Sequence, residues 1–358
     1  MKTSLFIFNS NMKKFIKKLF LIVLTVLLLL TTVNYFGDAA RLFDSNYEIK
    51  MASIIRQGYN VTNISNFNER LFQKEIIKNL KVNPDILVLG SSRSMLINSD
   101  YFEEEQFFNS SVSGASIEDI IGIYQLYIDN DKLPEKIILC IDPWIFNENN
   151  GQKRWQSLQL EYYKFKGEER IIENSLNIDK YFQIFSLSYF QGSLKNLFKV
   201  IFGENYPVAT KNKENENATI LIDGSYVYSK IKRECSEKLT ERISKQYVND
   251  EIYSIEQFEN ISEKIRNSFS LLIKDIKSKD IEIAFFLPPY YPSVYNVIRE
   301  DYTMVDMVEV YIIEYAKTNN IKVYGSFNPI NINLNESYFY DGMHCKESGI
   351  KKILNSKM

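Results

Sequence analysis

The chain has 358 residues, a formal net charge of −2 and 45% hydrophobic residues, so it can bury a full core, and its charge implies no nucleic acid or other polyanion as partner. Its three cysteines, Cys140, Cys235 and Cys345, do not make a disulfide framework. It has one histidine and no Cys/His cluster with metal spacing. We therefore expect no metal and no cofactor.

The N-terminal region predicts a single-pass membrane anchor. Residues 19–36 carry no charge and follow four lysines within residues 13–18. As a helix they would span about 27 Å, close to the ~30 Å of a bilayer core. Because the lysines precede this segment, residues 1–18 should be cytoplasmic and everything after residue 37 extracytoplasmic. A cleaved signal peptide, cut near Gly37-Asp38-Ala39, is the alternative.

The remainder is expected to form one large domain after a short connection. Residues 37–80 are mixed and mostly polar and are interpreted as a helical juxtamembrane stalk. Residues 81–358 then begin an alternation of apolar strands and amphipathic helices. The expected elements are a strand at 85–90, a weaker strand at 106–110, a helix at 116–130 and a strand at 136–142.

Residues 143–250 interrupt this alternation and are interpreted as an aromatic insertion over the strand ends. Within them, 211–217 is expected to be a loop and 219–229 a hairpin around Asp223-Gly224. The alternation resumes with a helix near 254–279, a strand at 281–287, a helix near 301–318, a strand at 321–324 and a helix near 346–355. This order predicts an α/β fold, a three-layer α/β/α sandwich with a parallel sheet whose functional site lies at the carboxyl ends of the strands.

Two segments carry residues suited to acyl-transfer chemistry. Asp341 precedes His344 by three residues, so its carboxylate can accept the Nδ1 proton and leave Nε2 facing a serine. Ser92 lies in a Gly-Ser-Ser turn after the first strand, where free backbone N–H groups can hold an oxyanion. Ser91 and Ser94 are rival nucleophiles, and each segment alone also suits an ordinary turn.

Other strand ends offer further site residues. Gly114 follows the second strand, where it can bring a backbone N–H to the reaction centre or be a simple loop glycine. Asp142 ends the third strand and can bind substrate or only close a turn. Trp144 can stack on a sugar or fill the core. Residues 286–292 end the fourth strand, and either shape a pocket wall or only terminate it. Cys345 adjoins the histidine, but sequence neighbours rarely face each other, so a thiol dyad is disfavoured.

The order of these motifs resembles the SGNH/GDSL hydrolase superfamily, over roughly residues 82–355. In that family the nucleophile is the third residue of the first block, which corresponds to Ser92. A glycine N–H of the second block, here Gly114, joins the Ser92 N–H in the oxyanion hole, and the Asp-x-x-His of the last block matches Asp341 and His344. With its anchor, the chain is similar to the membrane-anchored branch that assists lipoteichoic acid D-alanylation and alginate O-acetylation.

One block departs from the family pattern. The third block normally ends Gly-x-Asn-Asp, and its Asn completes the oxyanion hole, but here the strand ends Ile141-Asp142-Pro143-Trp144. An anionic Asp142 would repel an oxyanion, and loss of one donor typically slows such reactions by about 10²–10³. The departure favours a slow or specialised transferase.

The resemblance implies an extracytoplasmic serine esterase or O-acyltransferase that acts on acyl esters of a cell-envelope polysaccharide or related polymer. The aromatic insertion would recognise the glycan, and a membrane-bound O-acyltransferase is an expected partner. The alternative is a non-catalytic protein that keeps the SGNH fold to bind or scaffold an envelope polymer.

Overall fold

The computed structural model describes residues 2–44, 46–103, 105–168, 181–202, 206–249 and 252–355. The chain divides into two compact units. The first comprises Met1–Tyr47, Ser65–Phe67 and Ile171–Tyr206, and the second comprises Glu48–Ile64, Asn68–Arg170 and Pro207–Met358.

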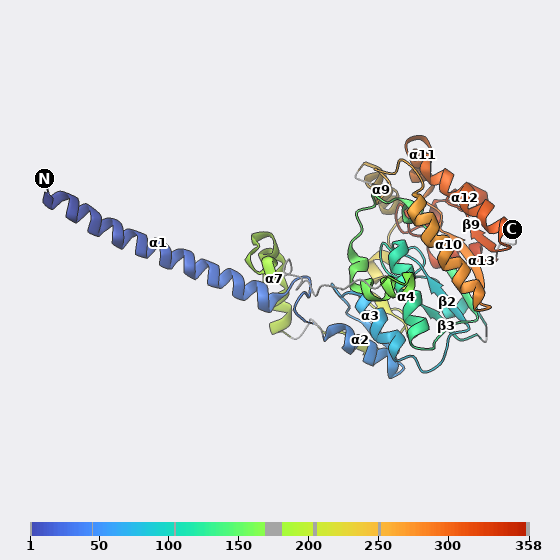
Figure 1. Cartoon of the computed structure of the whole chain (residues 1–358), viewed down its shortest axis with the longest axis horizontal. Helices are drawn as coiled ribbons and strands as arrows, with labels where there is room; N and C mark the ends of the chain where they lie inside the picture. The colour runs from blue at the N-terminus through green and yellow to red at the C-terminus, as the bar shows by residue number, and fades with distance from the viewer. Residues whose placement is uncertain are drawn as a thin grey trace. The chain divides into compact units, whose positions relative to one another are not determined.

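The first unit is built on one long helix, α1 (Lys2–Gly37), coloured blue in Figure 1. Its portion Asn11–Gly37 is the one stretch of the described chain that is long and apolar enough to cross a membrane, and it contains the predicted segment 19–36. The short helix η4 (Gln183–Phe185) and the longer α7 (Leu187–Ile201) pack against α1.

The second unit contains a five-stranded parallel sheet in the order β3-β2-β4-β8-β9. Its strands are β2 (Ile86–Leu89), β3 (Phe107–Asn109), β4 (Lys136–Cys140), β8 (Glu282–Leu287) and β9 (Lys322–Gly325). All five strands were predicted, and their ends agree to within two residues. Counted along the chain, their order is 2-1-3-4-5, which places a topological switch point between β2 and β4.

Burial of strand side chains and capping of the following helix explain this alternation. All four residues of β2 are buried, as expected for a strand covered on both faces. The helix after β3 is α4 (Ile117–Asp129), and it begins with a capping box between Ser116 and Asp119. Farther along, α10 (Glu263–Ser278) contacts β8 and α4, whereas α12 (Met304–Thr318) and α13 (Glu347–Asn355) contact β9.

Two helix predictions need correction. The helix expected near 254–279 begins only at Glu263, because turns occupy 253–257. The helix expected near 301–318 is preceded by a separate helix, α11 (Pro292–Asp301). Pro292 occupies its first turn, where the missing N–H costs nothing.

The stalk predicted for residues 37–80 is wrong for most of its length. Its elements α2 (Tyr47–Arg56), β1 (Asn60–Thr62) and α3 (Glu69–Lys78) lie almost entirely in the second unit. Arg70 of α3 is buried and pairs with Asp119 of α4 at 2.8 Å. A charge buried in this way needs a fixed partner, so α3 is part of the sheet domain rather than a linker.

A second, antiparallel sheet in the order β5-β1-β6-β7 was not predicted as a whole. The hairpin expected around Asp223-Gly224 is confirmed as β6 (Thr219–Ile220) and β7 (Tyr226–Val227), and 211–217 is a loop. The strands β1 and β5 (Val208–Thr210) were missed, because three-residue strands carry too little periodicity to be recognised.

The insertion predicted at 143–250 is divided between the two units. Residues 181–202 belong to the unit of α1, whereas 143–168 and 207–249 belong to the sheet unit. The remaining elements are η1 (Ser99–Tyr101), η2 (Pro143–Phe146), η3 (Arg154–Leu158), α5 (Gln159–Lys166), α8 (Lys230–Arg233), α9 (Glu237–Asn249), η5 (Pro329–Ile332) and η6 (Glu336–Tyr338).

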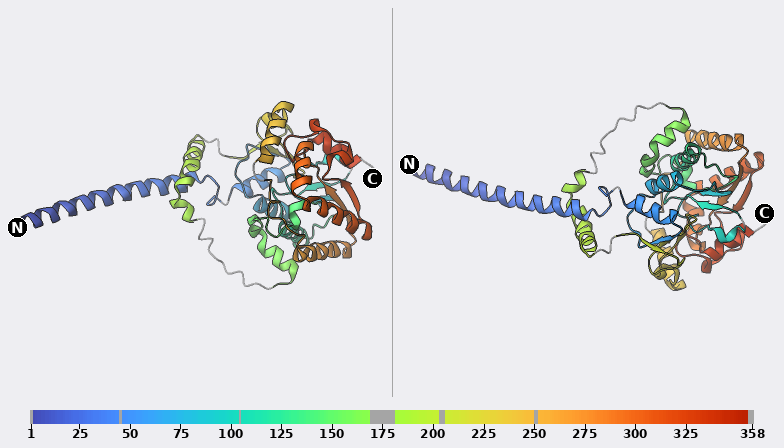
Figure 2. Two further views of the ribbon diagram at one scale, coloured as in Figure 1. Left: turned by 90° about the horizontal axis from the view of Figure 1, so that it is seen from above. Right: turned by 90° about the horizontal axis from the view of Figure 1, so that it is seen from below.

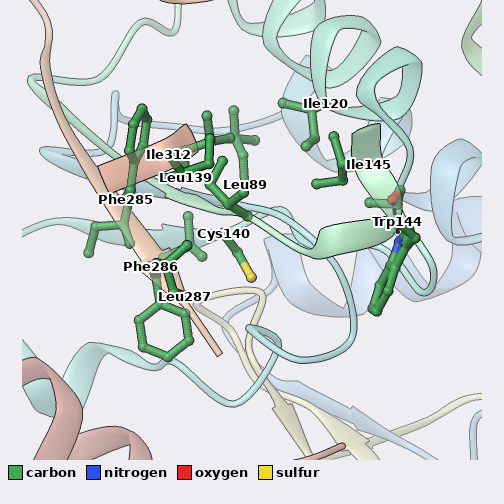
Figure 3. Packing of buried hydrophobic residues seen from close by; sticks show 14 of the residues in the cluster. Leu89, Ile120, Leu139, Cys140, Trp144, Ile145, Phe285, Phe286, Leu287 and Ile312 are labelled. Carbon is green, nitrogen blue, oxygen red and sulfur yellow. Dashed lines mark hydrogen bonds between the residues drawn. The ribbon is translucent and has the colours of Figure 1, made fainter. Parts of the chain in front are cut away.

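The core lies between the parallel sheet and its helices. Figure 3 shows Leu139 of β4 and Phe285 of β8 close to Ile312 of α12. Cys140, the next residue of β4, is fully buried on the other face of the sheet, as predicted for a small core residue. Each such large aliphatic or aromatic side chain contributes roughly 1.5–3 kcal/mol by leaving water, and together they fix the strand ends that carry the site.

Candidate active site

Ser92, His344 and Asp341 form a hydrogen-bonded chain. The Oγ of Ser92 lies 3.0 Å from Nε2 of His344. On the other side of the ring, Nδ1 lies 2.8 Å from Oδ1 and 3.0 Å from Oδ2 of Asp341. Residues 252 positions apart in the chain therefore meet at the end of β2 in the arrangement of a serine nucleophile, a base and an orienting carboxylate.

The loop that carries His344 is held by its own backbone. Phe339 and Cys345 form an isolated antiparallel bridge, and the N–H of Tyr340 donates to the carbonyl of His344 at 2.9 Å. Inside this loop, Oδ1 of Asp341 also accepts the N–H of His344 at 3.0 Å. These bonds fix the backbone between Asp341 and His344. With Nδ1 paired to the carboxylate, Nε2 points to the serine.

Lys232 is a site residue that the sequence did not indicate. Its Nζ donates to Oδ2 of Asp341 at 2.7 Å from helix α8, more than a hundred residues away in the chain. Burial by itself would raise the pKa of Asp341, but His344 and Lys232 outweigh it and hold that pKa well below its ordinary value. The carboxylate is therefore charged at neutral pH and able to stabilise an imidazolium.

Tyr228 forms part of the wall beside the imidazole. Its ring meets His344 edge-on at 6.1 Å between centroids, and the ammonium of Lys232 lies 4.1 Å from the Tyr228 ring centre. Tyr228 lies just after β7, so residues of the predicted insertion flank the histidine. The hairpin signal located this segment, but nothing in the sequence placed it beside His344.

The rival nucleophiles are engaged elsewhere. Ser91 is fully buried and its Oγ accepts the N–H of Arg93 at 3.1 Å. Ser94 is also buried, and its Oγ donates to the carbonyl of Ser91 at 2.9 Å. Burial raises the pKa of the Cys345 thiol and keeps it protonated. Within the described residues, Ser92 is the hydroxyl that reaches His344.

Gly114 has the backbone freedom that its predicted role requires. Its φ is +54°, and a Cβ there would collide with the side chains of Tyr253, Arg154 and Gln152. Among the hydrogen bonds of the described chain, neither the N–H of Ser92 nor that of Gly114 donates to another protein group.

Asp142 and Trp144 were expected to contact substrate, and their placement corrects this expectation. The Asp142 carboxylate is fully buried and lies 3.1 Å from Nη1 of Arg93. The Trp144 side chain is 1% exposed, and its indole N–H donates to the carbonyl of Ala115 at 3.1 Å. An indole enclosed in this way cannot stack on a sugar. Both residues stabilise the strand end beneath the site.

Arg93 is the residue that joins the loops around the site. It is buried, and besides Asp142 it donates to the carbonyl of Met343 at 3.0 Å and to that of Pro288 at 2.6 Å. Its guanidinium carbon also lies 4.1 Å from the Tyr290 ring centre. One side chain thereby connects the ends of β2, β4 and β8 to the loop of His344. The sequence showed Arg93 inside the serine motif but gave it no role.

In the described part of the chain, no group of three His, Cys, Asp or Glu residues is placed to hold a metal ion. The titratable groups that meet near the end of β2 are those of His344, Asp341 and Lys232. No known protein-family model matches this chain, and no curated protein matches its sequence.

Proposed function

We propose that this protein is a serine esterase or O-acyltransferase in which Ser92 is the nucleophile. The observation that carries the proposal is the continuous chain from Ser92 Oγ to His344 Nε2, at 3.0 Å, and from Nδ1 to Asp341, at 2.8 Å. Both distances are within the reach expected of a nucleophile and its base.

The reaction would proceed in two halves. Ser92 Oγ attacks the acyl carbonyl while Nε2 of His344 takes the hydroxyl proton, and the tetrahedral intermediate then expels the alcohol, which receives that proton. In the second half an acceptor hydroxyl loses its proton to Nε2 and attacks the acyl-serine, which restores the Ser92 hydroxyl. Water as acceptor gives hydrolysis, and a sugar hydroxyl gives transfer. Asp341 holds the imidazole in one tautomer throughout.

The proposed oxyanion hole consists of the Ser92 and Gly114 N–H groups. The sequence suggested that an anionic Asp142 in place of the third block would repel the oxyanion. Its pairing with the buried Arg93 balances that charge, which weakens the objection. The hole still lacks a side-chain amide, and a missing donor of this kind typically costs about 10²–10³ in rate.

The same proposal includes the fold family, the location and the substrate class. We place the sheet unit in the SGNH-type three-layer sandwich, because the 2-1-3-4-5 strand order and the positions of Ser92, Gly114, Asp341 and His344 agree with that family's blocks. The lysines before α1 favour a single-pass anchor with the site outside the cytoplasm. An acylated envelope polysaccharide or related polymer is then the proposed substrate, with a membrane-bound O-acyltransferase as proposed partner.

A second candidate function is a non-catalytic envelope protein that binds or scaffolds the polymer. The missing third-block amide favours it, since a catalytic hole with only two donors is weak. The two candidates differ in whether Ser92 reacts covalently with an activated acyl or phosphonyl group.

Labelling with a fluorophosphonate distinguishes them. The purified full-length protein should be labelled, and Ser92→Ala should abolish labelling, whereas the matched variant Ser94→Ala should keep most of it if circular dichroism shows an intact fold. Labelling that survives Ser92→Ala but disappears in Ser94→Ala would overturn the assignment. A folded wild type that is not labelled supports the non-catalytic candidate.

Turnover of a small activated ester tests the base. His344→Ala should remove turnover, and Asp341→Asn should cost less, because the carboxylate orients and stabilises the ring without accepting the substrate proton. Wild-type turnover in His344→Ala would rule out the triad.

Protease added to intact cells tests the location. The sheet unit should be degraded while the anchor remains with the membrane. A mature N-terminus at Ala40 would show instead that the N-terminal segment is cleaved.

A further inference from the structure

Helix α7 is fastened to the C-terminal end of α1. The side chain of Asn196 donates to the carbonyl of Gly37, and the N–H of Ala40 donates to the Tyr189 hydroxyl at 3.0 Å. Just before α7, the fully buried Asn34 donates to the carbonyl of Ser186 at 3.0 Å. Figure 1 and Figure 2 both show α7 lying across α1 at this end. The helix is therefore held at the level where the apolar part of α1 stops.

The outer face of α7 is apolar and uncovered within its unit. Leu187, Phe198 and Ile201 are 75%, 56% and 65% exposed, and Leu194 is exposed beside them. Their spacings of seven, four and three residues place them on one stripe of the helix. Leu194, Phe198 and Ile201 are neighbours on this stripe, whereas the exposed Gln191 separates Leu187 from them. The three form an apolar surface that water solvates poorly.

The residues next to this stripe identify the two faces of α7 that border it. Ser193, directly before Leu194, is fully buried on the α1 side. Lys195 and Lys199, directly after Leu194 and Phe198, are exposed. At about 100° per residue, the apolar stripe thus lies between the face on α1 and a basic face. A helix that lies flat in the membrane surface beside a spanning helix needs one face for that helix, one apolar face for lipid and one charged face for water.

Aromatic residues surround the same junction. Phe182 and Phe185 precede α7 and Phe202 follows it, all of them exposed. On α1, the exposed Tyr35 and Phe36 end the apolar segment. Aromatic side chains at the end of a spanning helix are typical of the membrane–water interface.

We propose that α7 lies in the surface of the bilayer that α1 spans, with its apolar stripe among the lipids at the headgroup–acyl boundary. The occupant of this face is lipid, because α7 packs against the end of the one described helix suited to cross a membrane. Amphipathic helices of this kind insert about 5–10 Å below the headgroups. The proposal requires α1 in a membrane and is independent of the chemistry at Ser92.

Nitroxide labelling of the full-length protein in phosphatidylcholine–phosphatidylglycerol vesicles tests the proposal. In a Cys235→Ser background, the other two cysteines are buried, so a cysteine introduced in place of Phe198 or Ile201 carries the label. Lys195→Cys and Lys199→Cys are matched controls on the basic face. Leu24→Cys in α1 reports whether the anchor is in the bilayer.

Power saturation should show that labels at positions 198 and 201 relax more with oxygen than with a water-soluble nickel chelate, and that labels at 195 and 199 show the reverse. Equal nickel access at all four positions would overturn the proposal. Protection from both reagents at 198 would also overturn it, since it means that protein, such as a second copy, covers the stripe. Nickel access at position 24 would mean that α1 does not span the bilayer, which also overturns the proposal. Ester turnover should be the same in every outcome, because the proposal is independent of the chemistry at Ser92.

Discussion

Substitution of Arg93 should strongly lower the stability of the fold. It pairs with Asp142 at 3.1 Å, and both side chains are 0% exposed. Replacement by methionine leaves the Asp142 charge buried without its partner. Burial already raises the pKa of Asp142 and Arg93 opposes that effect, so the variant loses the group that keeps this carboxylate charged.

The expected loss follows from these contacts. Breaking one side of a buried ion pair typically costs about 3–5 kcal/mol. The carbonyls of Met343 and Pro288 also lose their donor, and each unsatisfied buried group adds roughly 1–3 kcal/mol. Because domains are stable by only about 5–15 kcal/mol, we expect Arg93→Met to lose at least 3 kcal/mol or to fail to fold at 37 °C.

Urea unfolding followed by tryptophan fluorescence measures this loss, since the Trp144 ring lies 5.8 Å from the Arg93 guanidinium. Arg93→Lys keeps the charge but not the planar fork and should give an intermediate loss. The double variant Arg93→Met/Asp142→Leu removes both charges and should be less destabilised than the sum of the two single changes. The exposed Arg299 provides a control, and Arg299→Met should change the free energy of unfolding by less than about 0.5 kcal/mol.

Two outcomes would refute this reasoning. One is a decrease of less than 1 kcal/mol in the unfolding free energy of Arg93→Met, because removing a buried side chain that binds three separate loops should destabilise the fold by more than that. The other is additivity of the two single changes in the double variant, which would mean that Arg93 and Asp142 do not interact.

The remaining predictions concern the surroundings of His344. Lys232→Met should lower ester turnover by less than Asp341→Asn does, whereas Lys230→Met on the same short helix, where the lysine forms an exposed ion pair with Glu216, should leave turnover unchanged. Equal turnover in both lysine variants would contradict a role for Lys232. Because burial raises the pKa of its thiol, Cys345 should resist iodoacetamide in the native protein and react after unfolding, as peptide mass mapping would show; rapid native alkylation would contradict its burial. Because the pKa of Asp341 is lower in the folded protein, its charge stabilises the fold above the unfolded pKa of ~3.9, and this stabilisation is lost as the pH falls below that value. The difference in unfolding free energy between wild type and Asp341→Asn should therefore shrink on acidification. A difference that widens would mean that folding raises the pKa of Asp341 instead of lowering it.

The sequence by itself determined the features that depend on local pattern. The alternation of short apolar segments with helical patterns identified all five strands of the parallel sheet, and the Ser116 capping signal located the start of α4. The single histidine and its Asp341 neighbour, three residues apart, defined a loop pair that the structure joins at 2.8 Å. These inferences hold because each depends on residues close together in the chain.

Tertiary structure decided everything that depends on distant residues. The family resemblance favoured Ser92, but only the tertiary structure shows that Ser92, rather than Ser91 or Ser94, reaches His344, and Lys232 reaches Asp341 from a helix that no motif marked. Asp142 was expected to bind substrate or close a turn, but its carboxylate is buried and pairs with Arg93 from the neighbouring strand end. A sequence pattern predicts which face of a strand is buried, but the partner of a buried charge is set by how the strand ends pack together.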